Sequence, residues 1–180
     1  MTQQLPPPPP LRIGITGGIG SGKSRVALAV QALGYPVFHS DEAARRLMVE
    51  DAHLRQQLSN LLGEATYLPD GSLNKAHVGQ MIFGDEAMRE AVNAAVHPAV
   101  RRAADAWAEA KAQEGHQLMF QETALLYEAG LHHHLHQVWC VTAPEAERIR
   151  RVQARDGLSE QEIRARMARQ LPQAEKAQRA

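Results

Sequence analysis

A phosphate-binding loop near the N-terminus limits the possible folds of this chain more than any other feature. Residues Gly17–Ser24 read GGIGSGKS and match the pattern G-x-x-x-x-G-K-[ST]. An apolar run, Leu11–Thr16, precedes the loop, and apolar residues at helical spacing follow it over residues 25–33. Because such a loop is built between a buried strand and a helix, this context predicts an α/β fold of the P-loop NTPase type.

The residue types in the loop suit the binding of a nucleoside triphosphate. Glycines let backbone N–H groups approach an anion closely, and the following helix N-terminus adds a positive partial charge. Lys23 is expected to contact the β- and γ-phosphates, and the Ser24 hydroxyl is expected to bind Mg²⁺. We expect ATP to bind through Gly17, Gly18, Ile19, Gly20, Ser21, Gly22, Lys23 and Ser24.

The remaining apolar pattern predicts a three-layer fold with a parallel sheet. The expected strands are Leu11–Thr16, Pro36–Ser40, Gln117–Glu122 and Gln137–Thr142. Between the second and third strands, helical spacing predicts helices at 43–49, 54–62, 78–83, 87–96 and 99–110, with Pro98 starting the last of them. We therefore expect a Pro-rich tail over 1–10 and one domain over 11–180, with a helical insertion at about 41–116 and a charged helical lid at about 145–170.

Composition and a missing motif narrow the class of protein. Lysine and arginine number 20, as do aspartate and glutamate, so no nucleic-acid partner is expected. No apolar run reaches the length of a membrane span, and a cytoplasmic protein without a membrane partner is expected. The nearest match to the guanine motif N-K-x-D is Asn74–His77, which lacks the aspartate, so a small phosphotransferase is favoured over a GTPase.

Two carboxylates follow strands at the edge of the sheet where ligands gather. Asp41 follows the second strand, where it would cap a helix, orient and deprotonate an attacking hydroxyl, or do both. Glu122 ends the third strand, where it would order water bound to Mg²⁺ or else face solvent. We favour the functional interpretation for both residues.

Arginines and histidines supply further candidates. The arginines of 145–155 would form a charged helix face by default, but Arg151 and Arg155 are four residues apart and could reach the phosphates together. Four histidines, His132, His133, His134 and His136, are expected in a solvated segment rather than a metal site, and Cys140 is expected in the core.

The motifs together resemble the dephospho-CoA kinase family. The resemblance rests on TGGIGSGKS over 16–24 and GYPVFHSDEAARRL over 34–47. It continues through Asp70–Lys75, His97-Pro98, Leu125–Glu128, Arg155–Gly157 and Arg166–Gln170. His39 departs from the family, in which an acidic or amide residue is frequent at this position. The family also continues past the position of Ala180 into a strand and a closing helix.

The resemblance implies specific roles for residues in this sequence. Asp41 would be the catalytic carboxylate beside the ribose 3′-hydroxyl of dephospho-CoA, and Lys23, Arg151 and Arg155 would act on the transferring phosphoryl group. The acceptor would be bound by Asp41, Lys75, His97, Leu125, Leu126 and Glu128. The implied reaction uses ATP and Mg²⁺ and yields coenzyme A. A nucleoside or nucleoside-monophosphate kinase and a non-catalytic nucleotide sensor are the alternatives.

Overall fold

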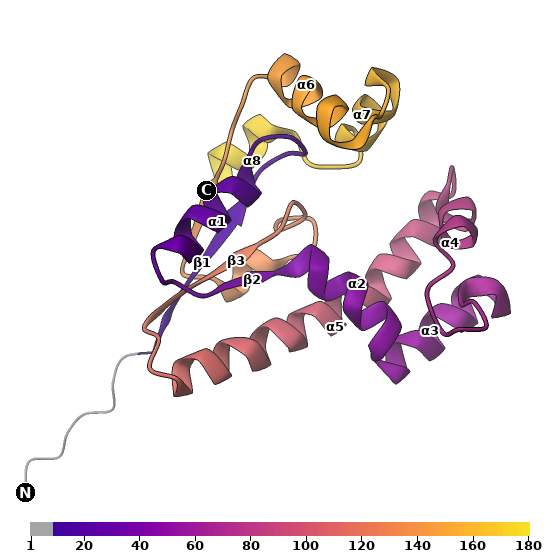
Figure 1. Ribbon diagram of the computed structural model, residues 1–180, viewed down its shortest axis with the longest axis horizontal. Coiled ribbons are helices and arrows are strands. Elements are labelled where there is room, and N and C mark those ends of the chain that lie inside the picture. Colours follow the sequence, from indigo (N-terminus) through magenta and orange to yellow (C-terminus); the bar gives the residue numbers. More distant parts are fainter. Residues whose placement is uncertain (1–8) are drawn as a thin grey trace, which may run out of the picture. The chain divides into compact units, whose positions relative to one another are not determined.

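A computed structural model describes residues 9–180, so all but Pro9 and Pro10 of the predicted Pro-rich tail lie outside the described residues. The chain divides into two compact units. The first holds the chain up to His39 together with Trp107–Ala180, and the second holds Ser40–Ala106 (Figure 1). Within the described residues no helix has the length and apolar character needed to cross a membrane.

A parallel sheet forms the centre of the first unit. Its strands are β1 (Leu11–Thr16), β2 (Val37–His39), β3 (Leu118–Glu122) and β4 (Gln137–Cys140). Within residues 9–180 the spatial order is β2-β3-β1-β4, and every pairing is parallel. The predicted parallel sheet and α/β class are confirmed; β1 has the predicted bounds, and the bounds of the other strands lie within two residues of the expected positions.

The two faces of the sheet are covered differently because side chains alternate along β1. Ile13 and Ile15 pack with helix α1 (Lys23–Ala32) and with Phe120 of β3. Gly14 points to the other face, where an added Cβ would come within 2.5 Å of Leu126. On β2, the ring of Phe38 packs 5.5 Å from that of Trp107.

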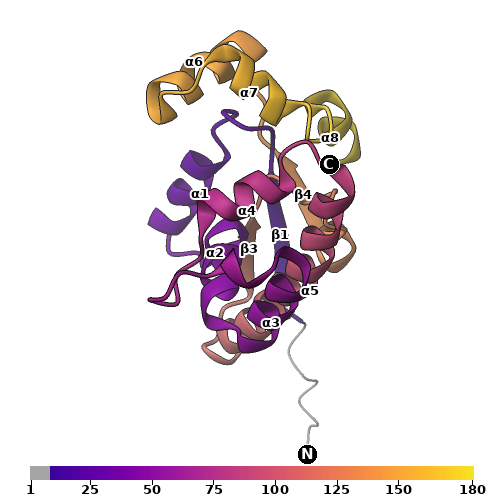
Figure 2. The same cartoon turned by 90° about the vertical axis from the view of Figure 1, so that its right-hand side faces the viewer.

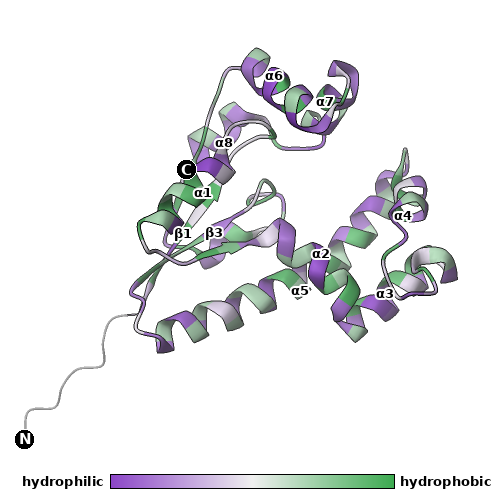
Figure 3. Cartoon of the chain, viewed as in Figure 1, coloured by the Kyte–Doolittle hydropathy of each residue, from purple (hydrophilic) through white to green (hydrophobic). Residues whose placement is uncertain are grey.

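Three more helices complete the first unit after β4. They are α6 (Glu145–Asp156), α7 (Glu160–Met167) and α8 (Gln173–Arg179). Hydrophilic residues dominate α6 and α7 (Figure 3), whereas Ile149, Val152 and Ile163 form a small buried cluster between the two helices. Ser159 and Glu162 form a capping box that begins α7. Two of these helices match the predicted charged segments, and α8 was not predicted.

Helix α8 is held by two polar side chains. The Gln173 amide donates to the Ala143 carbonyl and accepts from the Ala143 N–H, at 3.0 and 3.2 Å. Lys176 has no exposed surface, and its Nζ lies 2.7 Å from Glu128 Oε1. A fully buried ammonium group is tolerated in a protein only with such a partner.

The second unit is helical. It contains α2 (Ser40–Glu50), α3 (Ala52–Leu62), the 3₁₀ turn η1 (Glu64–Thr66), α4 (Lys75–Ile82) and most of α5 (Glu86–Gln113). Side-chain oxygens of Asp51 and Asn74 accept backbone hydrogen bonds at the starts of α3 and α4. Leu54, Leu58 and Leu62 are buried along one side of α3, as their helical spacing predicts.

The predicted helix boundary at Pro98 is wrong. Pro98 lies inside α5, which runs without a break from Glu86 to Gln113. Proline at the start of a helix was the simpler expectation, because inside a helix it removes one backbone hydrogen bond. Val96, Ala99 and Val100 are buried around Pro98, so packing of this apolar stretch opposes the local cost.

Candidate active site

The phosphate loop, Gly17–Ser24, runs from the end of β1 towards α6 and α7 (Figure 2). Gly17, Gly20 and Gly22 have φ values of 149°, 77° and 101°, which side chains disfavour. Helix α1 begins directly after Gly22, so its unpaired N–H groups lie at the end of the loop. This backbone is therefore suited to an anion, as the motif predicts.

Glu122 joins the two polar side chains at the start of α1. Its Oε1 accepts a hydrogen bond of 3.2 Å from the Ser24 hydroxyl and lies 3.7 Å from Lys23 Nζ. Its Oε2 lies 3.1 Å from Nδ1 of His39, whose backbone is opposite Glu122 in the β2–β3 register. Glu122 is 5% exposed, so the alternative of a strand-end charge facing solvent is wrong.

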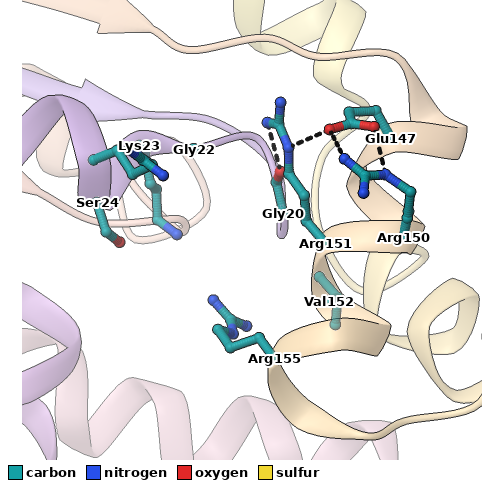
Figure 4. A pocket seen from close by; sticks show the side chains of 10 residues that line it. Gly20, Gly22, Lys23, Ser24, Glu147, Arg150, Arg151, Val152 and Arg155 are labelled. Carbon is teal, nitrogen blue, oxygen red and sulfur yellow. Dashed lines mark hydrogen bonds and ion pairs between the residues drawn. The ribbon is translucent and has the colours of Figure 1, made fainter.

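A cavity of about 630 Å³ lies between the phosphate loop and α6 (Figure 4). Its lining residues are Gly20, Gly22, Lys23, Ser24, Arg25, Glu147, Arg150, Arg151, Val152 and Arg155. Five of them are cationic and one is anionic, so the cavity favours a highly charged anion such as a triphosphate. The structure thus brings the predicted Arg151 and Arg155 to the same cavity as Lys23 and Ser24.

Glu147 pairs with two arginines at the edge of this cavity. It accepts hydrogen bonds of 2.8 Å from both Arg150 and Arg151. These two hydrogen bonds lower the pKa of Glu147 to about 2, and the bond from Arg150 contributes most. Arg155 instead donates to Asp156 at 2.7 Å, and Figure 4 shows its side chain extending from α6 into the cavity.

Arg148 and Gln170 contact the phosphate loop, and sequence reasoning missed both contacts. Arg148 Nε donates to the Ile19 carbonyl at 2.9 Å, and Gln170 Oε1 accepts from the Ile19 N–H at 2.9 Å. The default interpretation of the arginines as a charged face is wrong for Arg148, which is 7% exposed. Its spacing of four from Val152 is the signal that could have placed it on the buried face of α6.

Three candidate acceptor residues belong to the second unit. Asp41 is half-buried in the first turn of α2, where its charge complements the helix dipole. Lys75 is the exposed first residue of α4, and His97 is half-buried within α5. Their roles in binding an acceptor stay predictions.

The other candidate acceptor residues follow β3 in the first unit. Leu126 is fully buried in an apolar cluster with Tyr127 and Leu131, whereas Leu125 is half-buried. Glu128 accepts a 2.8 Å hydrogen bond from the Leu171 N–H and also pairs with Lys176. These contacts give Leu126 and Glu128 a role in holding this segment, and acceptor contacts by these residues stay predictions.

The histidine cluster and the cysteine lie away from the lining of the cavity. His133, His134 and His136 are exposed, as expected for a solvated segment. The ring of His132 is half-buried and packs 5.1 Å from that of Tyr127. Cys140 is half-buried rather than in the core, and burial raises the pKa of its thiol.

Known proteins similar to this chain agree with the geometry of the site. A family model described as dephospho-CoA kinase matches residues 11–180. The dephospho-CoA kinase of Salinibacter ruber is 43% identical over 168 residues, which are 93% of this chain and 84% of that protein. The enzyme of Shouchella clausii with the same name is 41% identical over 162 residues, 90% of this chain and 82% of that protein.

Solved structures agree as well. A crystal structure from Thermus thermophilus has a TM-score of 0.80 and 40% identity, covering 95% of this chain and 85% of the other. A dephospho-CoA kinase from Campylobacter jejuni, at 22% identity and a TM-score of 0.67, shares the fold over 94% of this chain and 84% of the other. On the family match and these identities, the chain belongs to the dephospho-CoA kinase family.

Proposed function

We propose that this protein transfers the γ-phosphoryl group of ATP to the ribose 3′-hydroxyl of dephospho-CoA, giving ADP and coenzyme A in the cytoplasm. The family match over residues 11–180 carries this proposal. The cationic cavity beside the phosphate loop supports the ATP half of the reaction.

In the proposed reaction, the 3′-hydroxyl oxygen bonds to the γ-phosphorus while the bond from that phosphorus to the β,γ-bridging oxygen breaks. Lys23 neutralises charge on the β- and γ-phosphates. Arg151 and Arg155 line the same cavity and stabilise the charge that develops on the transferring group. The exposed arginines exchange their present partners, Glu147 and Asp156, for phosphate oxygens.

The side chains at the start of α1 fit a magnesium ion bound with the nucleotide. Mg²⁺ prefers oxygen ligands and keeps several waters. Ser24 supplies a hydroxyl oxygen, and the buried Glu122 carboxylate beside it supplies an acceptor for metal-bound water. When bound, the ion would neutralise phosphate charge, and Ser24 and Glu122 are the residues that would hold it.

Asp41 is the proposed acceptor of the proton lost by the 3′-hydroxyl. It follows β2 by two residues in the chain, and helix α2 fixes its backbone. In phosphoryl transfer such a carboxylate acts mainly by orienting the hydroxyl. Lys75, His97, Leu125, Leu126 and Glu128 are proposed, on family resemblance, to form or support the binding site for the rest of dephospho-CoA.

A panel of acceptors tests the proposed function. ADP formation would be measured with dephospho-CoA, with adenosine, with a nucleoside monophosphate and with no acceptor. Turnover should depend on dephospho-CoA. Turnover with a nucleoside monophosphate but not with dephospho-CoA would favour the alternative kinase, and nucleotide binding without any turnover would favour the sensor.

Replacing Asp41 by asparagine tests its role separately. Asp41→Asn keeps the size of the side chain but removes its charge and basicity, so kcat should fall about 100-fold or more while KM for ATP changes less than about threefold. The matched control is Asp51→Asn, which changes an aspartate at the start of α3 that caps that helix. An Asp41→Asn enzyme with unchanged kcat would remove Asp41 from the reaction.

A further inference from the structure

Ile19, at the tip of the phosphate loop, is inserted between α6 and α7. Its side chain packs against the buried cluster of Ile149, Val152 and Ile163. Both of its backbone polar groups are bound by side chains from this part of the chain, the N–H by Gln170 and the carbonyl by Arg148. The tip of the loop is therefore held by apolar packing and by a hydrogen bond on each side of one residue.

Arg148 is the more constrained of the two partners. It is 7% exposed, although most arginines of α6 are exposed, and burial lowers the pKa of its guanidinium. An arginine keeps its charge in such a position, because the ordinary pKa of a guanidinium group lies far above neutral pH. Arg148 thus places a positive charge against the phosphate loop, to which the anionic ATP is proposed to bind. Arg148 is not among the residues that line the cavity with Arg151 and Arg155.

Gly18 gives an independent sign of this contact. Gly18 has no positive φ, unlike Gly17, Gly20 and Gly22, so its backbone accepts a side chain without strain. A Cβ added to Gly18 would nevertheless lie 2.4 Å from Nη2 and 2.8 Å from Cζ of Arg148. The backbone does not require glycine here, but a side chain at residue 18 would displace the guanidinium group from its present position.

We propose that Arg148 is a positioning residue, which together with Gln170 fixes the tip of the phosphate loop for ATP, and that Gly18 is glycine to admit the Arg148 guanidinium. The motif pattern leaves residue 18 open to any residue type. The charge of Arg148 acts on the nucleotide through the loop, and its hydrogen bond holds the Ile19 carbonyl away from the phosphates. This inference rests on the proposed ATP-dependent function.

A double-mutant cycle tests the pairing of Arg148 with Gly18. Arg148→Met keeps an unbranched apolar chain and removes the donor and the charge, so KM for ATP should rise about tenfold while KM for dephospho-CoA stays within about twofold. Gly18→Ala should raise KM for ATP about as much, because its methyl group displaces the guanidinium. In the double variant, KM for ATP should be at most about twofold higher than in the more affected single variant, because both changes break the same contact.

The outcomes of the cycle are distinct. Effects that multiply to about 100-fold in the double variant would overturn the pairing, because independent sites add in free energy. Loss of kcat alone, with KM for ATP unchanged, would overturn the positioning role. Arg164→Met is the matched control: this exposed arginine of α7 pairs with Glu145 and Glu160, and its kinetics should stay within about twofold of the parent.

Thermal unfolding without nucleotide provides the same cycle independently of catalysis. Gly18→Ala should lower the melting temperature in the parent protein and change it less in the Arg148→Met background. If Arg148→Met folds too poorly to measure, Arg148→Lys replaces it, because a lysine removes the planar group from Gly18 and Gly18→Ala should then cost less. Inactivity of the parent chain with dephospho-CoA would defeat the proposed function, whereas equal destabilisation by Gly18→Ala in both backgrounds would defeat only this inference.

Discussion

The two sides of the cavity are built in different ways. On the sheet side, the side chains of Lys23 and Glu122 are 14% and 6% exposed; Glu122 forms an ion pair with Lys23 and accepts a hydrogen bond from Ser24. On the α6 side, the side chains of Arg151 and Arg155 are 45% and 63% exposed and pair with carboxylates of their own helix. Arg151 also donates long hydrogen bonds of 3.4 and 3.3 Å to the Gly20 and Ser21 carbonyls of the phosphate loop. The first side is fixed by strand ends and loop backbone, and the second is held by contacts that water weakens.

This difference means that the sheet side of the cavity holds its groups in place, whereas the α6 side can change its partners. A buried charge keeps its place because losing its partner leaves it uncompensated, so the sheet side resists rearrangement. Exposed arginines exchange a carboxylate for a phosphate at little cost, because both partners offer oxygens of similar geometry. We therefore expect conservative substitutions to be severe on the sheet side and mild on the α6 side.

Lys23→Arg should have the largest effect of the changes that test this comparison. The planar guanidinium spreads its charge over three nitrogens, so it cannot reproduce the compact cation that Lys23 presents to the cavity 3.7 Å from Glu122. We expect kcat to fall about 1,000-fold, measured by ADP release with saturating dephospho-CoA. Retention of a tenth of the activity would show that the sheet side adapts as readily as the α6 side.

Glu122→Gln should rank second. The amide keeps the shape of the side chain and accepts from Ser24, but it loses the charge that faces Lys23 and His39. We expect kcat to fall about 100-fold, with the largest loss at low Mg²⁺ concentration. The matched control is Glu114→Gln, which makes the same exchange at an exposed position before β3. If Glu122→Gln were as active as the parent at every Mg²⁺ concentration, the role assigned to Glu122 would be contradicted.

Arg155→Lys should rank third and should separate the two sides most clearly. Arg155 is exposed, and a lysine there retains a mobile cation that can reach the same cavity. We expect kcat to fall about tenfold, far less than for the opposite exchange at Lys23. Steady-state kinetics on both variants check this order, and an equal loss in the two would remove the distinction.

Glu147→Gln should have the smallest effect and the opposite sign for binding. Removing the one anionic lining residue frees Arg150 and Arg151, so KM for ATP should fall about threefold. The pKa of Glu147 is lowered to about 2, so the carboxylate stays charged at every pH well above 2. Its charge is lost only as the pH falls towards about 2. The change in KM should therefore be the same from about pH 6 to about pH 9. Glu145→Gln, which removes a carboxylate paired with Arg164, is the control.

The sequence allowed the sheet side of the site to be predicted in detail. The motif identifies Gly17–Ser24, and strand periodicity places Glu122 at the end of β3. These positions follow from local pattern, because a parallel sheet brings the carboxyl ends of its strands to one edge. The four strands were predictable to within two residues because each is a short apolar run.

Features that depend on tertiary packing were not predictable. Pro98 is a helix-start signal by local rules, and the buried residues around it override that signal. Arg148 and Gln170 lie in charged segments of the sequence, and only the folded structure brings them to Ile19. Helix α8 depends on Gln173 and Lys176, whose partners are 30 and more residues away.

The contact between Phe38 and Trp107 bears on how the protein could be divided. These residues lie next to the two points at which the chain passes between the units, and their rings pack 5.5 Å apart. The nucleotide-binding unit therefore has its two internal chain ends side by side, as a domain that tolerates insertion requires. A short flexible linker in place of Ser40–Ala106 would join those ends and leave the phosphate loop and its cavity together in one smaller module.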